Sequence, residues 1–304
     1  MSKAAEKYIG ELVAPEHIWM QEPMSKHTTF RVGGPAKMLV QIESVQQLQK
    51  IVFYLSRLEE PYIVIGNGSN LLVSDRGYDG VVLEISSGMD KIEVRGEKIH
   101  VQAGALLSKT AAEAAKHGLT GMEFASGIPG CIGGAVVMNA GAYDGEMSKI
   151  VESVTVVNQT GELMVLDRDT MEFSYRNSII KNRPYIVAEA VLQLQKGDEA
   201  QIRAKMEEFA KLRREKQPLE YPSAGSTFKR PAGYFAGKLI MDAGMRGYRI
   251  GGAQVSEKHC GFLINIGNAT AQDIHELIMI VQETVKEKFH VELEPEVIQI
   301  GEFS

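Results

Sequence analysis

The sequence has little cysteine. Its 304 residues contain only Cys131 and Cys260. Two cysteines cannot form a disulfide framework, and neither lies in a C-x-x-C pair or in a Cys/His cluster with the spacing of zinc ligands. The sequence therefore predicts a protein of a reducing compartment, which we expect to be the cytoplasm, without a structural metal.

Long uninterrupted apolar runs are also missing. Residues 1–15 carry Lys3, Glu6, Lys7 and Glu11 and lack the apolar core of a signal peptide. The uncharged run 125–142 approaches the length of a membrane-spanning helix, but glycine and proline interrupt it. We therefore expect no membrane association and interpret this run as a system of glycine loops.

The chain has no excess of positive charge. It contains 33 Lys and Arg against 39 Asp and Glu, a net charge of −6. This is the wrong sign for a protein that binds nucleic acid by neutralising phosphates, so no nucleic-acid partner is expected. The local exception is 211–258, with ten basic and four acidic residues. That balance suits a diphosphate ligand, although the first four basic residues also fit the solvated face of a helix.

The remaining composition is that of a folded protein, and its apolar spacing predicts mixed secondary structure. Hydrophobic residues make up 44% and charged residues 24%, and the length favours two or three domains. Ser44 and Thr270 are expected helix N-caps, and Gly118 is expected to end a helix. The spacing predicts helices over 45–58, 106–117, 199–216, 235–243 and 271–289, and strands over 38–42, 62–65, 71–73, 99–103, 151–157, 186–194 and 297–300.

Two glycine-rich loops are the first chemical signal. Residues 66–70, Gly-Asn-Gly-Ser-Asn, follow a predicted buried strand, and small residues there let backbone N–H groups close around a pyrophosphate. The dinucleotide fingerprint does not fit, because Leu71 occupies the position of its third glycine and a strand follows. Alone, this loop is equally consistent with a plain turn. The uncharged segment 125–135 is a second such loop, and the pair favours one bound anionic cofactor.

The sequence resembles the flavin-dependent UDP-N-acetylenolpyruvoylglucosamine reductases of bacterial cell-wall synthesis, the MurB family. The resemblance extends from His27 to Val297, and its motifs lie at 27–34, 66–72, 127–135, 139–143, 175–178, 224–229, 250–253 and 294–297. It implies an α+β fold: FAD-binding subdomains of the vanillyl-alcohol-oxidase (PCMH) type at 1–83 and 84–198, then a connector helix and a domain for the UDP-sugar at 199–304. The FAD-binding residues that we expect are Gly66, Asn67, Gly68, Ser69, Asn70, Gly127, Ile128, Pro129, Gly130, Gly133, Gly134 and Ala135.

The implied activity is NADPH-dependent reduction of UDP-N-acetylenolpyruvoylglucosamine to UDP-N-acetylmuramate through non-covalent FAD, in peptidoglycan precursor synthesis. By the same resemblance, Arg176 binds the substrate carboxylate, and a planar guanidinium can resist the charge that develops there. Ser226 donates a proton to the intermediate. Glu296 orients the carboxylate or polarises the intermediate. We further expect a side chain at Gly68 to obstruct the pyrophosphate.

Each catalytic assignment has a structural alternative. Arg176 is also consistent with a solvated charge, Ser226 with a turn or helix cap, and Glu296 with a charge on a strand edge. Taken singly, these alternatives are the better interpretations. The ordered match of three distant segments favours the catalytic roles instead.

The substrate-binding residues that we expect are Tyr175, Lys229, Lys238 and Arg249. Longer members of the family carry an inserted loop with a tyrosine that covers the substrate, whereas here only 195–198 separate Leu194 from the connector helix. The chain therefore resembles the shorter type, and Tyr175, Tyr234 and Tyr248 are candidates to shield the nucleotide.

Two other functions remain open from the sequence. A flavin oxidase of the same fold acting on another small substrate accounts for the glycine loops, but not for Ser226, Glu296 and the basic segment. A nucleotide-sugar binding or regulatory protein without chemistry would not require Arg176, Ser226 and Glu296 together.

Overall fold

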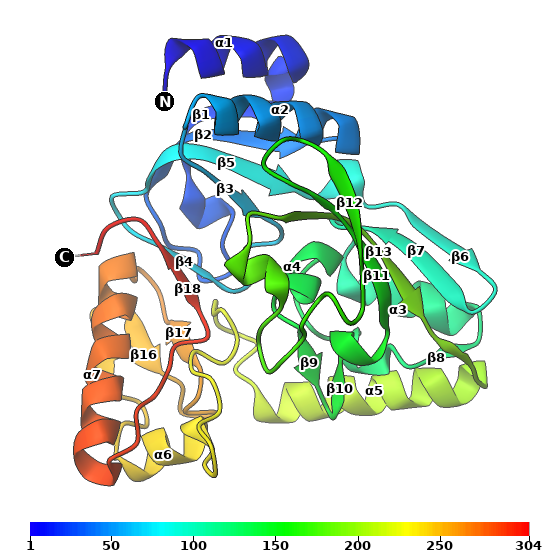
Figure 1. The fold of residues 1–304 in the computed structure, drawn as a ribbon. Coiled ribbons are helices and arrows are strands. Elements are labelled where there is room, and N and C mark those ends of the chain that lie inside the picture. The colour runs from blue at the N-terminus through cyan, green and yellow to red at the C-terminus, as the bar shows by residue number, and fades with distance from the viewer. Residues whose placement is uncertain (304) are drawn as a thin grey trace. The chain divides into compact units, whose positions relative to one another are not determined.

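The computed structural model describes residues 1–303, which form two compact units. Unit 1 consists of Met1–Met20, Met38–Asn67 and Gly80–Leu212, and unit 2 of Gln21–Lys37, Gly68–Asp79 and Arg213–Ser304. Each unit has its own hydrophobic core. The chain order of the elements can be followed by colour in Figure 1.

The first part of the chain contains a four-stranded sheet with the order β1-β2-β5-β3. In unit 1, β3 runs parallel to β5, with Tyr62 opposite Val81 and Ile65 opposite Glu84. Helix α2 packs Leu48, Ile51, Val52 and Leu55 into the core, and Ser44 caps it as predicted. The elements are α1 (Lys3–Leu12), η1 (Pro15–His17), β1 (Ile18–Pro23), η2 (Met24–Lys26), β2 (Pro35–Ile42), α2 (Val45–Arg57), β3 (Tyr62–Ile65), β4 (Leu71–Val73), β5 (Tyr78–Ile85) and η3 (Ser87–Met89).

Helix α1 was not among the predicted elements, because four of its ten residues are charged and the segment was interpreted as polar. Ser2 caps it by accepting a hydrogen bond from the Ala5 N–H at 3.2 Å. Ala5 and Ile9, one turn apart, are fully buried, and Tyr8 stacks on Tyr54 of α2 with ring centroids 3.7 Å apart. Figure 1 shows α1 lying along α2. Packing against α2 therefore decides this helix, which its sequence alone signals weakly.

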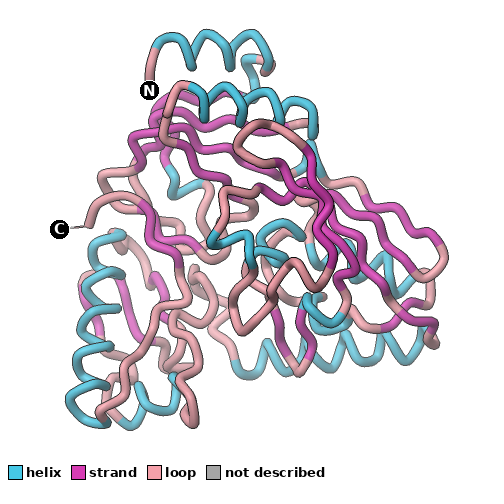
Figure 2. The backbone as a smooth tube through the Cα atoms, in the orientation of Figure 1, coloured by secondary structure: helices cyan, strands magenta, loops and turns pink. Residues whose placement is uncertain are grey.

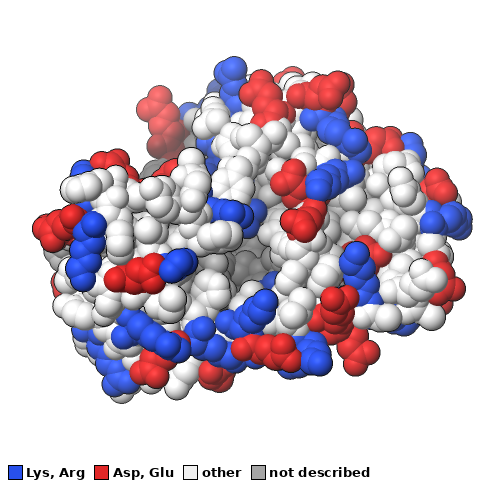
Figure 3. All heavy atoms as spheres, turned by 90° about the horizontal axis from the view of Figure 1, so that it is seen from below, with Lys and Arg blue, Asp and Glu red and all other residues white. Residues whose placement is uncertain are grey.

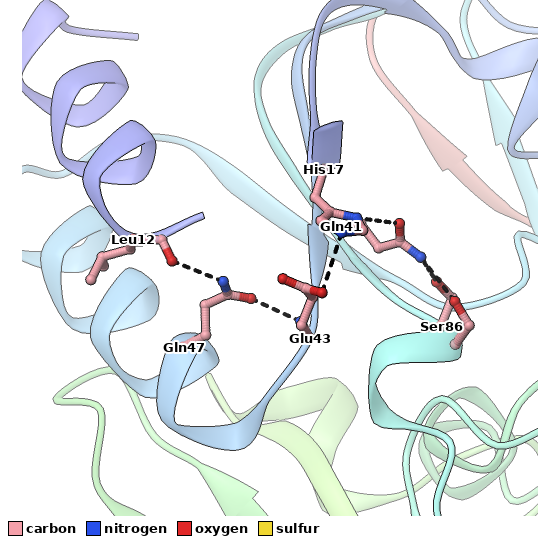
Figure 4. Close-up of polar contacts among 7 residues, drawn as sticks. Leu12, His17, Gln41, Glu43, Gln47 and Ser86 are labelled. Atoms are coloured by element: carbon pink, nitrogen blue, oxygen red, sulfur yellow. Dashed lines mark hydrogen bonds and ion pairs between the residues drawn. The ribbon is translucent and has the colours of Figure 1, made fainter. Parts of the chain in front are cut away.

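A polar network fastens the chain that follows α1 (Figure 4). The His17 ring lies 3.2 Å from the Glu43 carboxylate and 3.0 Å from the Gln41 side-chain oxygen. Gln41 donates in turn to the Ser86 hydroxyl at 3.0 Å. Gln47 donates to the last carbonyl of α1. These bonds pair polar groups that are partly buried.

The larger part of unit 1 is an antiparallel sheet with the order β12-β11-β13-β7-β6. On β11, Val154 and Val156 are fully buried while Thr155 between them is half-buried, as expected for a sheet with one covered face. The elements are β6 (Ile92–Arg95), β7 (Lys98–Gln102), α3 (Leu107–Lys116), β8 (Leu119–Thr120), η4 (Glu123–Ala125), α4 (Ile132–Val137), β9 (Gly141–Ala142), β10 (Gly145–Glu146), η5 (Met147–Lys149), β11 (Val151–Val157), β12 (Leu163–Asp167), η6 (Ile179–Asn182), β13 (Ile186–Gln193) and β14 (Gln195–Lys196).

Two segments beside this sheet, the uncharged run 125–142 and the connection after β13, can be compared with what the sequence predicted. The uncharged run 125–142 is not only loop, because α4 lies within it and buries Ile132, Ala135 and Val136. After β13 the chain passes through β14, which pairs with β8, directly into α5 (Glu199–Lys216). Residues 194–198 therefore connect β13 to α5 without an inserted loop.

Unit 2 combines short strands with long turns, drawn pink in Figure 2. Its sheet has the order β15-β16-β17, and β18 pairs in parallel with β4, with Ile298 opposite Leu71. Thr270 caps α7 in a reciprocal capping box with Asp273. The elements are α6 (Ala236–Asp242), β15 (Arg249–Ile250), β16 (Ala253–Val255), β17 (Leu263–Asn265), α7 (Ala271–Phe289) and β18 (Ile298–Ile300).

Within residues 1–303, no helix has both the length and the apolar character needed to cross a membrane. The same residues contain no group of three or more His, Cys, Asp or Glu side chains arranged to hold a metal ion.

Candidate functional site

The first glycine loop follows β3 and requires its glycines for internal packing. Gly68 has a φ of +58°, and a Cβ atom at this position would lie 1.9 Å from the His27 carbonyl oxygen. A Cβ atom at Gly66 would lie 2.1 Å from the Cys131 sulfur. The expectation that a side chain at Gly68 obstructs the pyrophosphate stays a prediction. Because such a side chain would first collide with the protein's own backbone, loss of flavin from a Gly68 variant would not by itself locate the phosphates.

The second loop uses some of its backbone groups internally. The N–H groups of Ile132 and Gly133 donate to the carbonyls of Ala105 and Ala103, and Ile128 donates to Ala125. The Gly127, Gly130 and Gly134 N–H groups form none of these bonds. Gly134 is exposed, and a Cβ atom there would meet only the Cys131 sulfur, at 4.0 Å. Close approach by a ligand is therefore possible at Gly134, whereas Gly133 is packed against Ala103.

The residues beside the first loop fit an anionic cofactor. The carbonyls of Gly68 and Asn70 accept hydrogen bonds from the N–H groups of Thr29 and Ile298, while the loop's own N–H groups form none of these bonds. The Thr29 hydroxyl oxygen is buried and has no hydrogen-bond partner among the described residues. Phosphate oxygens only accept hydrogen bonds, so they can pair with these N–H groups and with the Thr29 hydroxyl. The loop therefore suits the pyrophosphate of FAD.

Arg176 lies at the tip of a tight turn in unit 1. Ser174 and Asn177 exchange two backbone hydrogen bonds of 3.1 Å across it, and Arg176 itself has a φ of +55°. Its guanidinium donates to the Gly141 carbonyl at 3.2 Å and lies 5.1 Å from the centre of the Tyr175 ring. A half-buried arginine with a left-handed backbone is costly to maintain, which argues against a merely solvated charge.

Asn139 holds this turn in place, a role that the sequence alone did not indicate. The side chain is 1% exposed, and its amide nitrogen donates to the Ser174 carbonyl at 3.0 Å. Its amide oxygen accepts from the Ser148 N–H at 2.9 Å. Asn139 thus connects the Arg176 turn to the segment after the β9–β10 hairpin. The only sequence signal was its place in the 139–143 motif.

Ser226 and Glu296 are brought together in unit 2. The Glu296 N–H donates to the Thr227 carbonyl at 2.8 Å, and the Lys229 N–H donates to the Glu294 carbonyl at 2.8 Å. The two segments therefore pair antiparallel, with Phe228 opposite Pro295. Thr227 is fully buried, whereas Ser226 beside it is exposed.

The same pairing connects the catalytic candidates to the first glycine loop. The Asn70 side chain donates to the Glu296 carbonyl at 3.0 Å. Asn70 thus fixes the backbone of Glu296 relative to the loop that it terminates. Ser226, Glu296 and Asn70 form one constellation in unit 2, and Arg176 belongs to unit 1.

The expected substrate-binding cations already have carboxylate partners. Lys229 pairs with Glu294, and Lys238 lies 2.7 Å from Asp242 one helical turn later. Arg249 is exposed on β15, and Tyr175 is 50% exposed. On the face drawn in Figure 3, basic and acidic side chains are interleaved. An anionic ligand would therefore bind Lys229 or Lys238 in competition with these carboxylates.

His259 was not identified from the sequence, although it lies close to the Ser226 segment. Its Nδ1 accepts from the Gly261 N–H at 3.1 Å, and the Gly261 carbonyl accepts from the Thr227 N–H at 2.8 Å. Burial lowers the pKa of His259 below its ordinary value near 6.5. The ring is therefore neutral at pH 7, with its proton on Nε2.

Comparison with known proteins covers both units. Residues 36–167 match an FAD-binding domain family, and residues 217–300 match the C-terminal domain of UDP-N-acetylenolpyruvoylglucosamine reductase. The chain is 51% identical over 294 residues to the UDP-N-acetylenolpyruvoylglucosamine reductase of Caldanaerobacter subterraneus subsp. tengcongensis, covering 97% of each chain.

Solved structures agree with the sequence matches. The crystal structure of the reductase from Thermus caldophilus, called MurB, has a TM-score of 0.81 and 36% identity, covering 92% of this chain and 98% of that one. A variant of Phl p 4 described as a glucose oxidase has a TM-score of 0.50 at 14% identity, over 64% of this chain and 44% of its own. At that identity the likeness concerns the fold alone. The predicted fold class, a PCMH-type FAD-binding module followed by an α+β domain, is confirmed.

Proposed function

The chain belongs to the UDP-N-acetylenolpyruvoylglucosamine reductase family, and from that premise we propose that Arg176, Ser226 and Glu296 perform its chemistry. The protein is an FAD-containing oxidoreductase that reduces UDP-N-acetylenolpyruvoylglucosamine with NADPH, in peptidoglycan precursor synthesis. In our proposal it works in the cytoplasm, and its direct partners are small molecules.

Bound FAD supplies hydride chemistry, which side chains of the protein cannot perform. We place its pyrophosphate at residues 66–70 and the rest of the cofactor along 127–135, where Gly134 leaves space. In this proposal, 1–83 and 84–198 are the two FAD-binding subdomains and 199–304 is the substrate domain.

Arg176 binds the carboxylate of the enolpyruvyl group in this mechanism. Negative charge grows on that carboxylate as hydride reaches the neighbouring double bond, and a guanidinium that is already oriented stabilises the charge without reorganising. The left-handed turn and its Asn139 anchor support this role because they fix the position of Arg176 before the substrate arrives.

Ser226 donates the proton that completes the reduction. The adjacent carbon of the substrate becomes basic once hydride has been added, so a hydroxyl in line with it is a sufficient acid. Ser226 is exposed on a segment held by the buried Thr227, and solvent can then reprotonate its oxygen. Glu296 assists by orienting the substrate carboxylate or by polarising the intermediate.

The observation that carries the proposal is the pairing of Thr227 with Glu296, which fixes Ser226 and Glu296 on neighbouring segments. Residues that merely shape a turn or discourage strand pairing would not need such a connection. Tyr175, Lys229, Lys238 and Arg249 remain our candidates for contact with the UDP-sugar.

Single-turnover kinetics under anaerobic conditions test the role of Ser226. Ser226→Ala is expected to keep its FAD and its rate of reduction by NADPH, since neither needs the hydroxyl. Reoxidation of the pre-reduced variant by the enolpyruvyl substrate should slow by roughly 10²–10⁴, the contribution of a positioned general acid.

Ser223→Ala is the matched control, because it removes a hydroxyl from the same loop and should leave reoxidation at the wild-type rate. A Ser226→Ala rate within a few fold of wild type would show that another group delivers the proton. Steady formation of hydrogen peroxide without any need for NADPH would instead indicate a flavin oxidase.

A further inference from the structure

The Thr29 side chain has no role in the proposed mechanism. Its hydroxyl oxygen is one of two buried side-chain polar atoms in residues 1–303 without a hydrogen-bond partner. A buried hydroxyl without a partner destabilises a folded protein, because it has lost its bonds to water. Such a group therefore needs an explanation.

The position of Thr29 beside the first glycine loop supplies one. Its N–H donates to the Gly68 carbonyl at 3.2 Å. A Cβ atom at Gly68 would lie 1.9 Å from the His27 carbonyl oxygen and 3.1 Å from the Thr28 Cα. Segment 27–29 thus lies directly against the loop that we assign to the pyrophosphate.

The neighbouring threonine shows that this backbone does not force its hydroxyls to remain unpaired. Thr28, 6% exposed, donates from its hydroxyl to the Val32 carbonyl at 2.9 Å. The Gly68 carbonyl already accepts the backbone hydrogen bond of Thr29 itself. The Thr29 hydroxyl can donate a hydrogen bond, and a phosphate oxygen is an acceptor that cannot donate.

We propose that the Thr29 hydroxyl donates a hydrogen bond to a phosphate oxygen of bound FAD, as a cofactor ligand outside both glycine loops. This inference rests on the proposed placement of the pyrophosphate at 66–70. Thr29 pre-forms the site, since the desolvation of its hydroxyl is complete before the cofactor binds, and the cofactor then restores the missing bond.

Thr29→Val, which keeps the shape and removes the hydroxyl, is the test. A hydrogen bond to a charged group contributes about 1.5–3 kcal/mol, so the Kd of the flavin-free protein for FAD should rise roughly 10- to 150-fold. The Kd is measured by quenching of flavin fluorescence. The Tm of the flavin-free variant should equal or exceed that of wild type, because the variant no longer buries an unpaired hydroxyl. Thr29→Ser should recover most of the affinity.

Thr28→Val is the matched control. It loses the bond to Val32, so it should lower the Tm of the flavin-free protein, the opposite sign to Thr29→Val. An unchanged Kd in Thr29→Val, or a Tm below wild type, would overturn the inference. If wild-type protein itself failed to bind FAD, the proposed function would fail instead, so the two failures are distinguishable.

Discussion

Replacement of Asn139 by alanine should damage both stability and catalysis. The change removes hydrogen bonds to the Ser174 carbonyl and the Ser148 N–H, each contributing about 1 kcal/mol. Asn139 also has a φ of +42°, and alanine in the left-handed region costs about 1–2 kcal/mol more. Together these effects predict a loss of about 3–4 kcal/mol in the free energy of unfolding.

Asn139→Gly separates the two contributions. Glycine tolerates the positive φ, so this variant should lose only the hydrogen bonds and some chain entropy, about 2–3 kcal/mol. Urea unfolding, followed by circular dichroism and by flavin fluorescence, measures both variants. The ranking should be wild type, then glycine, then alanine.

Catalysis provides a second measurement on the same variants. Without Asn139 the Arg176 turn loses the hydrogen bond at Ser174, and displacement of a charge-stabilising group by about 1 Å can lower turnover by roughly 10²-fold. FAD content should remain full, since Asn139 lies outside both glycine loops. An alanine variant with the wild-type unfolding midpoint and wild-type turnover would refute this account of the turn.

Two further predictions concern the cofactor loop and pH. Gly134→Val should fold normally yet purify with little FAD. The valine side chain would meet open space in the protein, but it would lie where we expect the cofactor to approach. Full FAD occupancy, measured by flavin absorbance, would show that the cofactor lies elsewhere. Burial holds the pKa of His259 in the folded protein below its ordinary 6.5, so the unfolded chain binds more protons near that pH. The contribution of His259 to stability is therefore complete above about pH 6.5, and it is lost as the pH falls through the folded-state pKa. His259→Gln should therefore flatten the decline in unfolding free energy between about pH 7 and pH 5, and an unchanged slope would contradict this assignment.

Local patterns predicted most of the secondary structure. Strands β3, β4 and β11 and helices α5 and α7 have the bounds that apolar spacing indicated, and both predicted N-caps, Ser44 and Thr270, are present. These elements are decided by near neighbours in the chain, namely a cap, an apolar period and a following glycine or proline. Helices α1 and α4 did not follow from the local pattern. Helix α1 depends on its packing against α2, where Tyr8 stacks on Tyr54. Helix α4 lies in a glycine-rich segment that was interpreted as loop, and it buries Ile132, Ala135 and Val136.

The sequence by itself determined the family, because its motifs recur in order along nearly the whole chain, and with the family came FAD and the reaction. Only the tertiary structure decided that Gly66 and Gly68 are required by Cys131 and His27, that Asn139 anchors the Arg176 turn, and that Thr227 connects Ser226 to Glu296. The reason is physical. A motif contains the residue types that the chemistry needs. A buried hydrogen bond or a close backbone contact, in contrast, depends on two segments that lie far apart in the sequence, and no local pattern specifies such a pair.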